Sequence, residues 1–151
     1  MNEAETQMVD AATLMLRRTY SADIETVFNA LTKAEAIKAW FGPGAMKVTH
    51  SACDLRVGGR WVIEMLTPEG NMHNVGGEYI EIDRPRSVKF TWAWQFEPDE
   101  VSEVTYRLKR INEGSTLFTL IHSRLPSENS RDLHGQGWNK TLDNLGPWLA
   151  P

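Results

Sequence analysis

The stretch SENSRDLHGQGWNKTLDNLG at residues 127–146 predicts the long helix on which the fold depends. Ser127 and Ser130 are both suitable N-caps, because a serine oxygen accepts a hydrogen bond from a free N–H of the first turn. One face of this helix carries residues that recur at helical spacing, namely His134, Trp138, Leu142 and Leu145. Gly146-Pro147 is expected to end or kink the helix.

Upstream of this helix, six stretches have the composition and spacing of strands. They are 45–55, 60–67, 72–83, 86–96, 101–111 and 116–124. Short turn sequences such as Pro68-Glu69-Gly70-Asn71 separate successive strands, which favours an antiparallel meander. Gly76-Gly77 predicts a bulge or bend within its strand.

The N-terminal end of the chain is predicted to hold one further strand, at residues 12–20. Residues 1–11 are acidic and lack the apolar core of a signal peptide, so we expect them to be a loose leader. Because no linker, repeat or low-complexity tract interrupts the remainder, residues 12–151 are expected to form a single domain.

Two short helices are expected after this first strand. Residues 22–31 place apolar side chains on one helical stripe, and Ser21 is expected to cap them. The second helix is expected to begin at a capping box, Thr32-Lys33-Ala34-Glu35, and to end at Gly42-Pro43-Gly44.

This order of elements predicts an α+β helix-grip fold, in which a curved antiparallel sheet is wrapped around the long C-terminal helix. The apolar face of such a sheet has to be covered, and only the C-terminal helix is long enough to cover it. Because a strongly twisted sheet curves away from a single helix, the two leave space for a ligand between them.

Charge and cysteine content exclude several classes of function. The formal net charge of −4 argues against a nucleic-acid binder and against docking on an anionic membrane. No apolar run approaches the length of a membrane span. Cys53 is the only cysteine, so the chain cannot form an internal disulfide, which is typical of a cytoplasmic protein.

Six tryptophans among 151 residues are the most unusual feature of the composition. Their alternation along the strands directs several of these rings toward the space beneath the helix. Large rings can fill a core or line an apolar pocket. The pocket interpretation gives a ligand-binding set of Trp40, Trp61, Ile63, Met65, Trp92, Trp94, Tyr106, Phe118, His122, His134, Trp138 and Leu142.

The two histidines of this set have two interpretations. They can be hydrogen-bonded structural residues, or they can serve as polar anchors for a ligand or as a general base. Because they lie on facing elements, the two rings could satisfy each other or share a ligand oxygen. Glu64 and Glu78 are expected on the outer face of the sheet; a carboxyl group that pointed inward would be a candidate acid or base.

Metal binding, nucleophilic catalysis and cofactor binding are not expected. The four histidines, which include His50 and His73, lack metal-ligand spacing, and Cys53 lies on another segment. The chain has neither a Gly-x-Ser-x-Gly elbow nor a glycine-rich phosphate loop, and Gly58-Gly59 suits a turn. We therefore predict no metal, no cofactor and no catalytic residue.

Several segments, in this order and spacing, carry a resemblance to a known family. They are Trp40-Phe41-Gly42-Pro43, Asp54-Leu55-Arg56-Val57-Gly58-Gly59-Arg60-Trp61, Gly77-Glu78-Tyr79-Ile80-Glu81-Ile82, Phe90-Thr91-Trp92, Gly114-Ser115-Thr116-Leu117 and Gly137-Trp138. Over residues 12–149 the chain resembles the C-terminal-domain-like family of the activator of heat-shock protein 90 ATPase. This family lies within the START-like (SRPBCC) superfamily of birch-pollen allergens and polyketide cyclases. The helix break at Gly146-Pro147 departs from the family's pattern.

The resemblance implies a helix-grip domain that binds or carries an apolar small molecule in a cavity between the sheet and the C-terminal helix. A small cofactor-independent enzyme of cyclase, lyase or hydrolase type, acting through cavity His or Glu residues, is the alternative. The family's name adds a chaperone partner as a further alternative. We favour the carrier over the enzyme. The sequence leaves open whether the protein forms a homodimer.

Overall fold

The computed structural model describes residues 5–150, which form eight strands and three helices. The elements in chain order are β1 (Glu5–Asp10), β2 (Thr13–Tyr20), α1 (Ile24–Thr32), α2 (Ala34–Trp40), β3 (Lys47–Cys53), β4 (Arg60–Leu66), β5 (Met72–Asp83), β6 (Ser87–Trp94), β7 (Ser102–Asn112), β8 (Ser115–Ser123) and α3 (Glu128–Leu149). The α+β class is confirmed, as are the six strands from β3 to β8.

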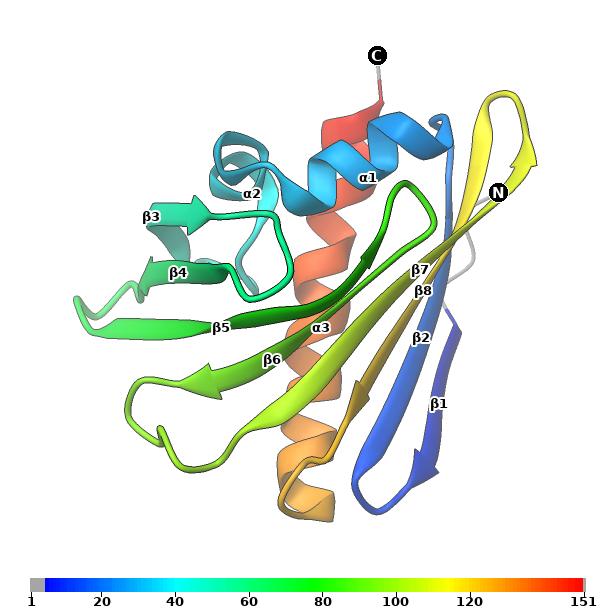
Figure 1. The fold of residues 1–151 in the computed structure, drawn as a ribbon. Coiled ribbons are helices and arrows are strands. Elements are labelled where there is room, and N and C mark those ends of the chain that lie inside the picture. The colour runs from blue at the N-terminus through cyan, green and yellow to red at the C-terminus, as the bar shows by residue number, and fades with distance from the viewer. Residues whose placement is uncertain (1–4, 151) are drawn as a thin grey trace.

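All eight strands form one antiparallel sheet in the order β1-β2-β8-β7-β6-β5-β4-β3. The sheet is curved, and α3 runs across one of its faces, while α1 and α2 lie near the C-terminal end of α3 (Figure 1). This arrangement is the predicted helix grip.

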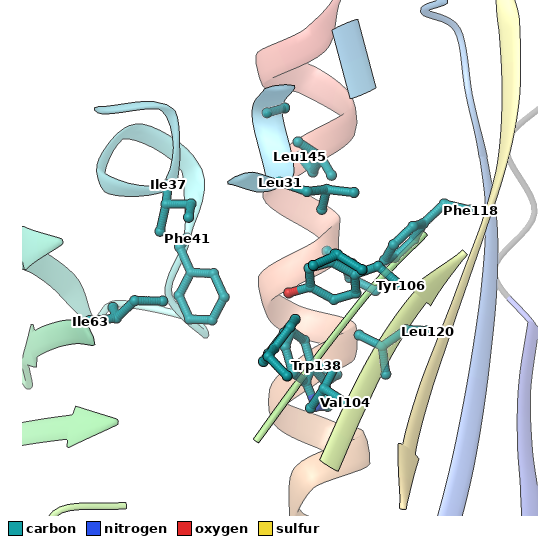
Figure 2. Packing of buried hydrophobic residues seen from close by; sticks show 14 of the residues in the cluster. Leu31, Ile37, Phe41, Ile63, Val104, Tyr106, Phe118, Leu120, Trp138 and Leu145 are labelled. Carbon is teal, nitrogen blue, oxygen red and sulfur yellow. The ribbon is translucent and has the colours of Figure 1, made fainter. Parts of the chain in front are cut away.

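The face of the sheet toward α3 is apolar because the side chains of a strand alternate between two faces. On β6 the buried residues are Val88, Phe90 and Trp92, while Lys89 and Thr91 lie on the other face. The same alternation runs through β7 and β8, so the rings of the central strands meet beneath α3. Figure 2 shows Tyr106 and Phe118 on this side of the core, close to Trp138 of α3.

An ion pair fixes α3 against strand β2. Arg18 points inward from β2 and is buried, and its guanidinium donates to Asp143 Oδ1 over 2.8 Å. It also donates to the carbonyl and side-chain oxygens of Asn139, over 3.2 and 3.0 Å. These bonds set the position of the C-terminal half of α3 relative to the sheet.

The prediction of a loose leader at residues 1–11 is wrong for the part that the structure describes. Glu5–Asp10 forms β1, an edge strand that pairs with β2. All six of its residues are exposed. A strand with both faces in water carries no apolar alternation, so the sequence held no signal for it. Residues 1–4 lie outside the described residues. Because β1 comes before it, the strand predicted at residues 12–20 is the second strand, β2, and the two short helices follow it.

Two predicted helix caps are also wrong. Asp23, not Ser21, caps α1, with its carboxylate accepting from the backbone N–H of Thr26 over 2.8 Å. The capping box at residues 32–35 does not form, because the hydroxyl of Thr32 donates to the carbonyl of Phe28 and Lys33 is the N-cap of α2. Thr32 is thus the last residue of α1, and Lys33, in an extended conformation, separates the two helices.

Gly146-Pro147, which was expected to end or kink α3, does not end it, because the helix continues to Leu149 with Pro147 inside it. A proline disfavours helix in the preceding residue through clashes with the backbone N–H and the Cβ of that residue, and Gly146 has no Cβ. The backbone N–H of Ala150 then bonds to the carbonyl of Gly146 over 3.1 Å. At its other end, α3 is capped by Ser127, as predicted.

The glycines of β5 allow a close approach of neighbouring strands. A Cβ at Gly77 would overlap the carbonyl oxygen of Thr91 on β6. The register shift of β5 against β6, however, lies between Tyr79 and Glu81 and not at Gly76-Gly77. The glycines therefore serve close packing at this point of the sheet.

Candidate binding groove

Aromatic rings from the sheet and from α3 form a continuous buried cluster. Trp92 lies at its centre, with ring centroids 5.0 Å from Trp138 and 5.6 Å from Trp61. Phe90 and Tyr106 extend the cluster away from Trp92 along the sheet, with their ring centroids 5.1 Å apart. Their alternate positions on β4, β6 and β7 direct all these rings to one face of the sheet.

His122 is buried within this cluster and has a partner on each ring nitrogen. Trp138 donates its indole N–H to Nδ1 over 3.0 Å. The proton of His122 is therefore on Nε2, which lies 2.7 Å from Ser102 Oγ, and the Ser102 hydroxyl in turn donates to the carbonyl of Trp92. Burial, together with the neighbouring His134, holds the pKa of His122 well below its usual range.

His134 of α3 is half-buried and is bonded in a similar way. The indole N–H of Trp94 donates to its Nε2 over 3.0 Å, so Nδ1 carries the proton and lies 2.7 Å from the carbonyl oxygen of Ser130. Burial lowers the pKa of His134. Both imidazoles are thus neutral at pH 7, and each takes its tautomer from a tryptophan donor.

The histidines lie side by side, with ring centroids 4.9 Å apart, but they do not hydrogen-bond each other. The two rings therefore do not satisfy each other, although each is a hydrogen-bonded histidine, as the structural interpretation expected. Because protein groups occupy their nitrogens, neither ring is free to abstract a proton in this arrangement.

The interior beneath α1 and α2 is almost filled. A cavity of about 20 Å³ remains between these helices and strands β4 to β7. About 10–15 Å³ accommodates a single water, whereas sites for drug-sized ligands measure about 300–1,000 Å³. Figure 2 shows the hydroxyl of Tyr106, on the wall of this cavity, pointing toward the side of the core where Phe41 lies. Burial raises the pKa of Tyr106, so the hydroxyl stays protonated.

A much larger hollow, of about 810 Å³, opens between the N-terminal half of α3 and strands β4 to β6. We call it the groove. Its wall is mainly apolar and includes Phe41, Met46, Met65, Trp92, Trp94, Phe96, Leu133 and Trp138. Its charged lining residues are Glu97 and Glu100 of the loop after β6. The neighbouring Glu97 carboxylate raises the pKa of Glu100, because it accepts a hydrogen bond from the protonated Glu100 carboxyl group and repels the ionised one.

The residues expected to bind ligand divide among three places. Trp40, Trp61, Ile63, Trp92 and Tyr106 line the small cavity. Met65, Trp92, Trp94, His134 and Trp138 line the groove. Phe118, His122 and Leu142 line neither, because they are packed within the core at 0, 0 and 1% exposure.

The sequence interpretation missed groove residues that lie outside buried strands and helix faces. Phe96 and Leu133 are 60% and 57% exposed, which is unusual for large apolar side chains. Phe96 was detectable, because it continues the alternation of Phe90, Trp92 and Trp94 beyond the end of β6. Phe41 and Met46 flank the Gly-Pro-Gly loop, and no periodicity marks them.

One side chain that lines the groove has a buried polar atom without a partner among the described residues. The indole N–H of Trp92 is buried and makes no hydrogen bond to any described residue. The other buried indoles of the site donate to protein acceptors: Trp138 to His122, and Trp61 to the carbonyl of Thr91 over 3.2 Å. A free donor of this kind is uncommon in a buried setting.

The candidate acids lie away from the groove. Glu64 is on the opposite face of β4 from Ile63 and Met65, and Glu78 is exposed. Within residues 5–150, no group of three or more His, Cys, Asp or Glu side chains could hold a metal ion. Over the same range, no helix has the length and apolar character needed to cross a membrane.

Comparison with known proteins finds one family and several similar structures. The family model described as activator of Hsp90 ATPase homolog 1-like protein matches residues 21–150. No curated protein sequence matches significantly. Protein NE0264 from Nitrosomonas europaea is 27% identical with a TM-score of 0.79, and the match covers 92% of this chain and 95% of that one. The AHSA1 protein from Silicibacter pomeroyi is 26% identical, with a TM-score of 0.82 and coverage of 91% and 97%. CalU16 from Micromonospora echinospora, in solution, is 27% identical, with a TM-score of 0.71 and coverage of 99% and 74%.

Proposed function

This chain belongs to the family of activator of Hsp90 ATPase homolog 1-like proteins, and we propose that it binds and carries an apolar small molecule in the groove between α3 and the sheet. The single observation that carries the proposal is the groove itself. Its volume of about 810 Å³ lies within the range of sites for drug-sized ligands.

The lining of the groove supports an apolar ligand. Trp94 and Phe96 stack with ring centroids 5.6 Å apart at the rim, and Leu133 faces them from α3 as a lining residue. Phe96 and Leu133 are largely exposed, so a bound molecule would remove their apolar surface from water. Burial of such surface stabilises a complex by about 25 cal/mol per Å² before the costs of association.

Carriage is favoured over catalysis by the state of the titratable groups. The ring nitrogens of His122 and His134 are already hydrogen-bonded within the protein. Glu64 and Glu78 do not line the groove, and the two carboxyl groups that do, Glu97 and Glu100, are exposed to solvent on the loop after β6. An enzyme would need two convergent groups free to exchange protons. No observation on the described residues favours a chaperone-directed role over the groove.

The proposal can be tested by titration with N-phenyl-1-naphthylamine, a neutral apolar dye whose fluorescence rises in apolar surroundings. We expect a dissociation constant on the order of micromolar, near −8 kcal/mol, together with quenching of tryptophan fluorescence. Gly137→Leu is the test variant, because Gly137 lines the groove and a Cβ added there meets open space. The new side chain should occupy the groove and weaken binding about tenfold or more.

Gln136→Leu is the matched control. Gln136 is next to Gly137 on α3, is exposed and does not line the groove. The substitution adds the same leucine side chain as Gly137→Leu, but outside the groove. It should bind the dye as the unmodified protein does. Equal affinities of the Gly137→Leu and Gln136→Leu proteins would contradict binding in the groove.

A further inference from the structure

We propose that the indole N–H of Trp92 is the polar anchor of the groove. The ligand is then a neutral apolar molecule that presents a hydrogen-bond acceptor without a formal charge, such as a ketone, ester or ether oxygen. This inference rests on the proposed function, whose site it specifies further.

The first support is the contrast between Trp92 and the other buried indoles. Trp138, Trp94 and Trp61 donate to His122, His134 and the carbonyl of Thr91. Trp40 donates to the carbonyl of Ala30. Trp92 is only 5% exposed, and its Nε1 has no partner among the described residues. Since a buried donor without an acceptor is unfavourable, a ligand that supplies the acceptor gains more than one that does not.

The second support is the place of Trp92 between the two hollows. Trp92 and Phe41 line both the groove and the small cavity. The Trp92 ring also contacts Trp138, His122 and His134, with centroid distances of 5.0, 5.5 and 6.3 Å. It therefore lies on the wall that the groove shares with the small cavity, among buried rings, where the buried end of a bound molecule would come to rest.

The third support is the charge of the lining. The charged side chains of the groove are Glu97 and Glu100, and no Lys or Arg lines it. His134, the histidine beside Trp94, is bonded as a neutral ring. A ligand carboxylate would find no lysine or arginine counter-ion among the lining residues, which besides His134 include His73, and it would lie near the two glutamates. Neutral acceptors suit the site better than fatty-acid anions.

The inference predicts the outcome of a cycle of two probes and two proteins. The probes are 2-nonanone and 2-methyl-1-nonene, which differ only in the replacement of the carbonyl oxygen by a methylene group. The proteins are the unmodified chain and Trp92→Phe, which removes the N–H but keeps an aromatic ring. For each probe, we compare its dissociation constants for the two proteins. The free energy of the probe in water is the same in both measurements and therefore cancels.

Trp92→Phe should weaken binding of 2-nonanone about tenfold, the effect of one net hydrogen bond, and should leave 2-methyl-1-nonene nearly unchanged. Trp148→Phe is the control, because Trp148 is partly exposed and does not line the groove; it should affect neither probe. Equal weakening of both probes by Trp92→Phe would contradict the inference while leaving the proposed function intact. Failure of both probes to bind the unmodified protein would contradict the proposed function and the inference with it.

A second measurement uses the unmodified protein, so it does not depend on whether a variant at position 92 folds. In a spectrum of ¹⁵N-labelled indoles, 2-nonanone should shift the Trp92 N–H downfield, and 2-methyl-1-nonene should not. Because neither probe has a ring, ring currents of the ligand do not contribute. Nonanoate should bind at least tenfold more weakly than 2-nonanone. An unshifted Trp92 signal with bound 2-nonanone, or tighter binding of nonanoate, would overturn the inference.

Discussion

The indole N–H of Trp138 donates a hydrogen bond to Nδ1 of His122 over 3.0 Å, and both side chains are buried. This bond joins α3 to β8 at the centre of the aromatic cluster. It also fixes the tautomer of His122, because an accepting Nδ1 places the proton on Nε2, facing Ser102. His122 is thereby held as a neutral, fully bonded ring, which suits a structural role.

Replacing Trp138 and Trp92 with phenylalanine should affect stability differently. Both changes remove the same atoms, but only Trp138→Phe leaves a buried acceptor, His122 Nδ1, without a donor. Such an orphaned group costs about 1–3 kcal/mol, in addition to the loss of ring contacts that both variants share. Unfolding in urea should therefore show a larger loss for Trp138→Phe than for Trp92→Phe. The reverse order would contradict the hydrogen-bond assignments at these two rings.

The buried histidines predict that stability falls in mildly acidic solution. Burial lowers the pKa of both His122 and His134 in the folded state, below the value of about 6.5 expected on unfolding. Between the folded and unfolded pKa values the unfolded chain binds more protons, so the free energy of unfolding rises with pH. The stabilisation is complete above about pH 6.5 and is lost as the pH falls below it, by at most about 1.4 kcal/mol per pH unit for each histidine.

The check is the free energy of unfolding measured from pH 7.5 to pH 5 for the unmodified protein and for His122→Gln. Glutamine keeps a donor and an acceptor but does not titrate in this range. The variant should show a shallower dependence on pH, although its stability at pH 7.5 is lower. Parallel curves for the two proteins would show that His122 takes up no proton on unfolding.

Two glycines should respond oppositely to alanine. At Gly77 an added Cβ would overlap the carbonyl oxygen of Thr91, so Gly77→Ala has to displace β5 from β6 and should be strongly destabilising. At Gly137, within α3, the added methyl meets open space. Gly137→Ala should stabilise the protein by about 0.5–1 kcal/mol, because alanine favours the helix. Thermal unfolding of both variants tests this, and a destabilised Gly137→Ala would mean that position 137 is not open.

The sequence was sufficient to predict the helix grip because its signals are local and periodic. Alternation along residues 86–96 identified β6 and its inward face, and the spacing of His134, Trp138 and Leu142 identified the inner face of α3. These patterns report which residues turn inward. Two of the signals that failed had competing residues nearby: Asp23 caps α1 in place of Ser21, and Thr32 bonds within its own helix.

The site was less predictable because it depends on how rings pack. The same inward stripes that define β6 and β7 could have lined a large cavity, but their rings meet closely and leave about 20 Å³. Phe96 and Leu133 belong to the groove, although they lie beyond a strand end and on the less buried side of α3. The free indole N–H of Trp92 results from distances between side chains, which no sequence pattern reports.

Methyl NMR of ¹³C-methyl-methionine protein tests most directly whether the groove binds apolar molecules. Met46 and Met65 line the groove, whereas Met8 and Met15 lie on β1 and β2 and do not line it. On addition of N-phenyl-1-naphthylamine, ring currents of the bound dye should shift the Met46 and Met65 signals and leave those of Met8 and Met15 in place. Unchanged Met46 and Met65 signals in the presence of bound dye would contradict binding in the groove.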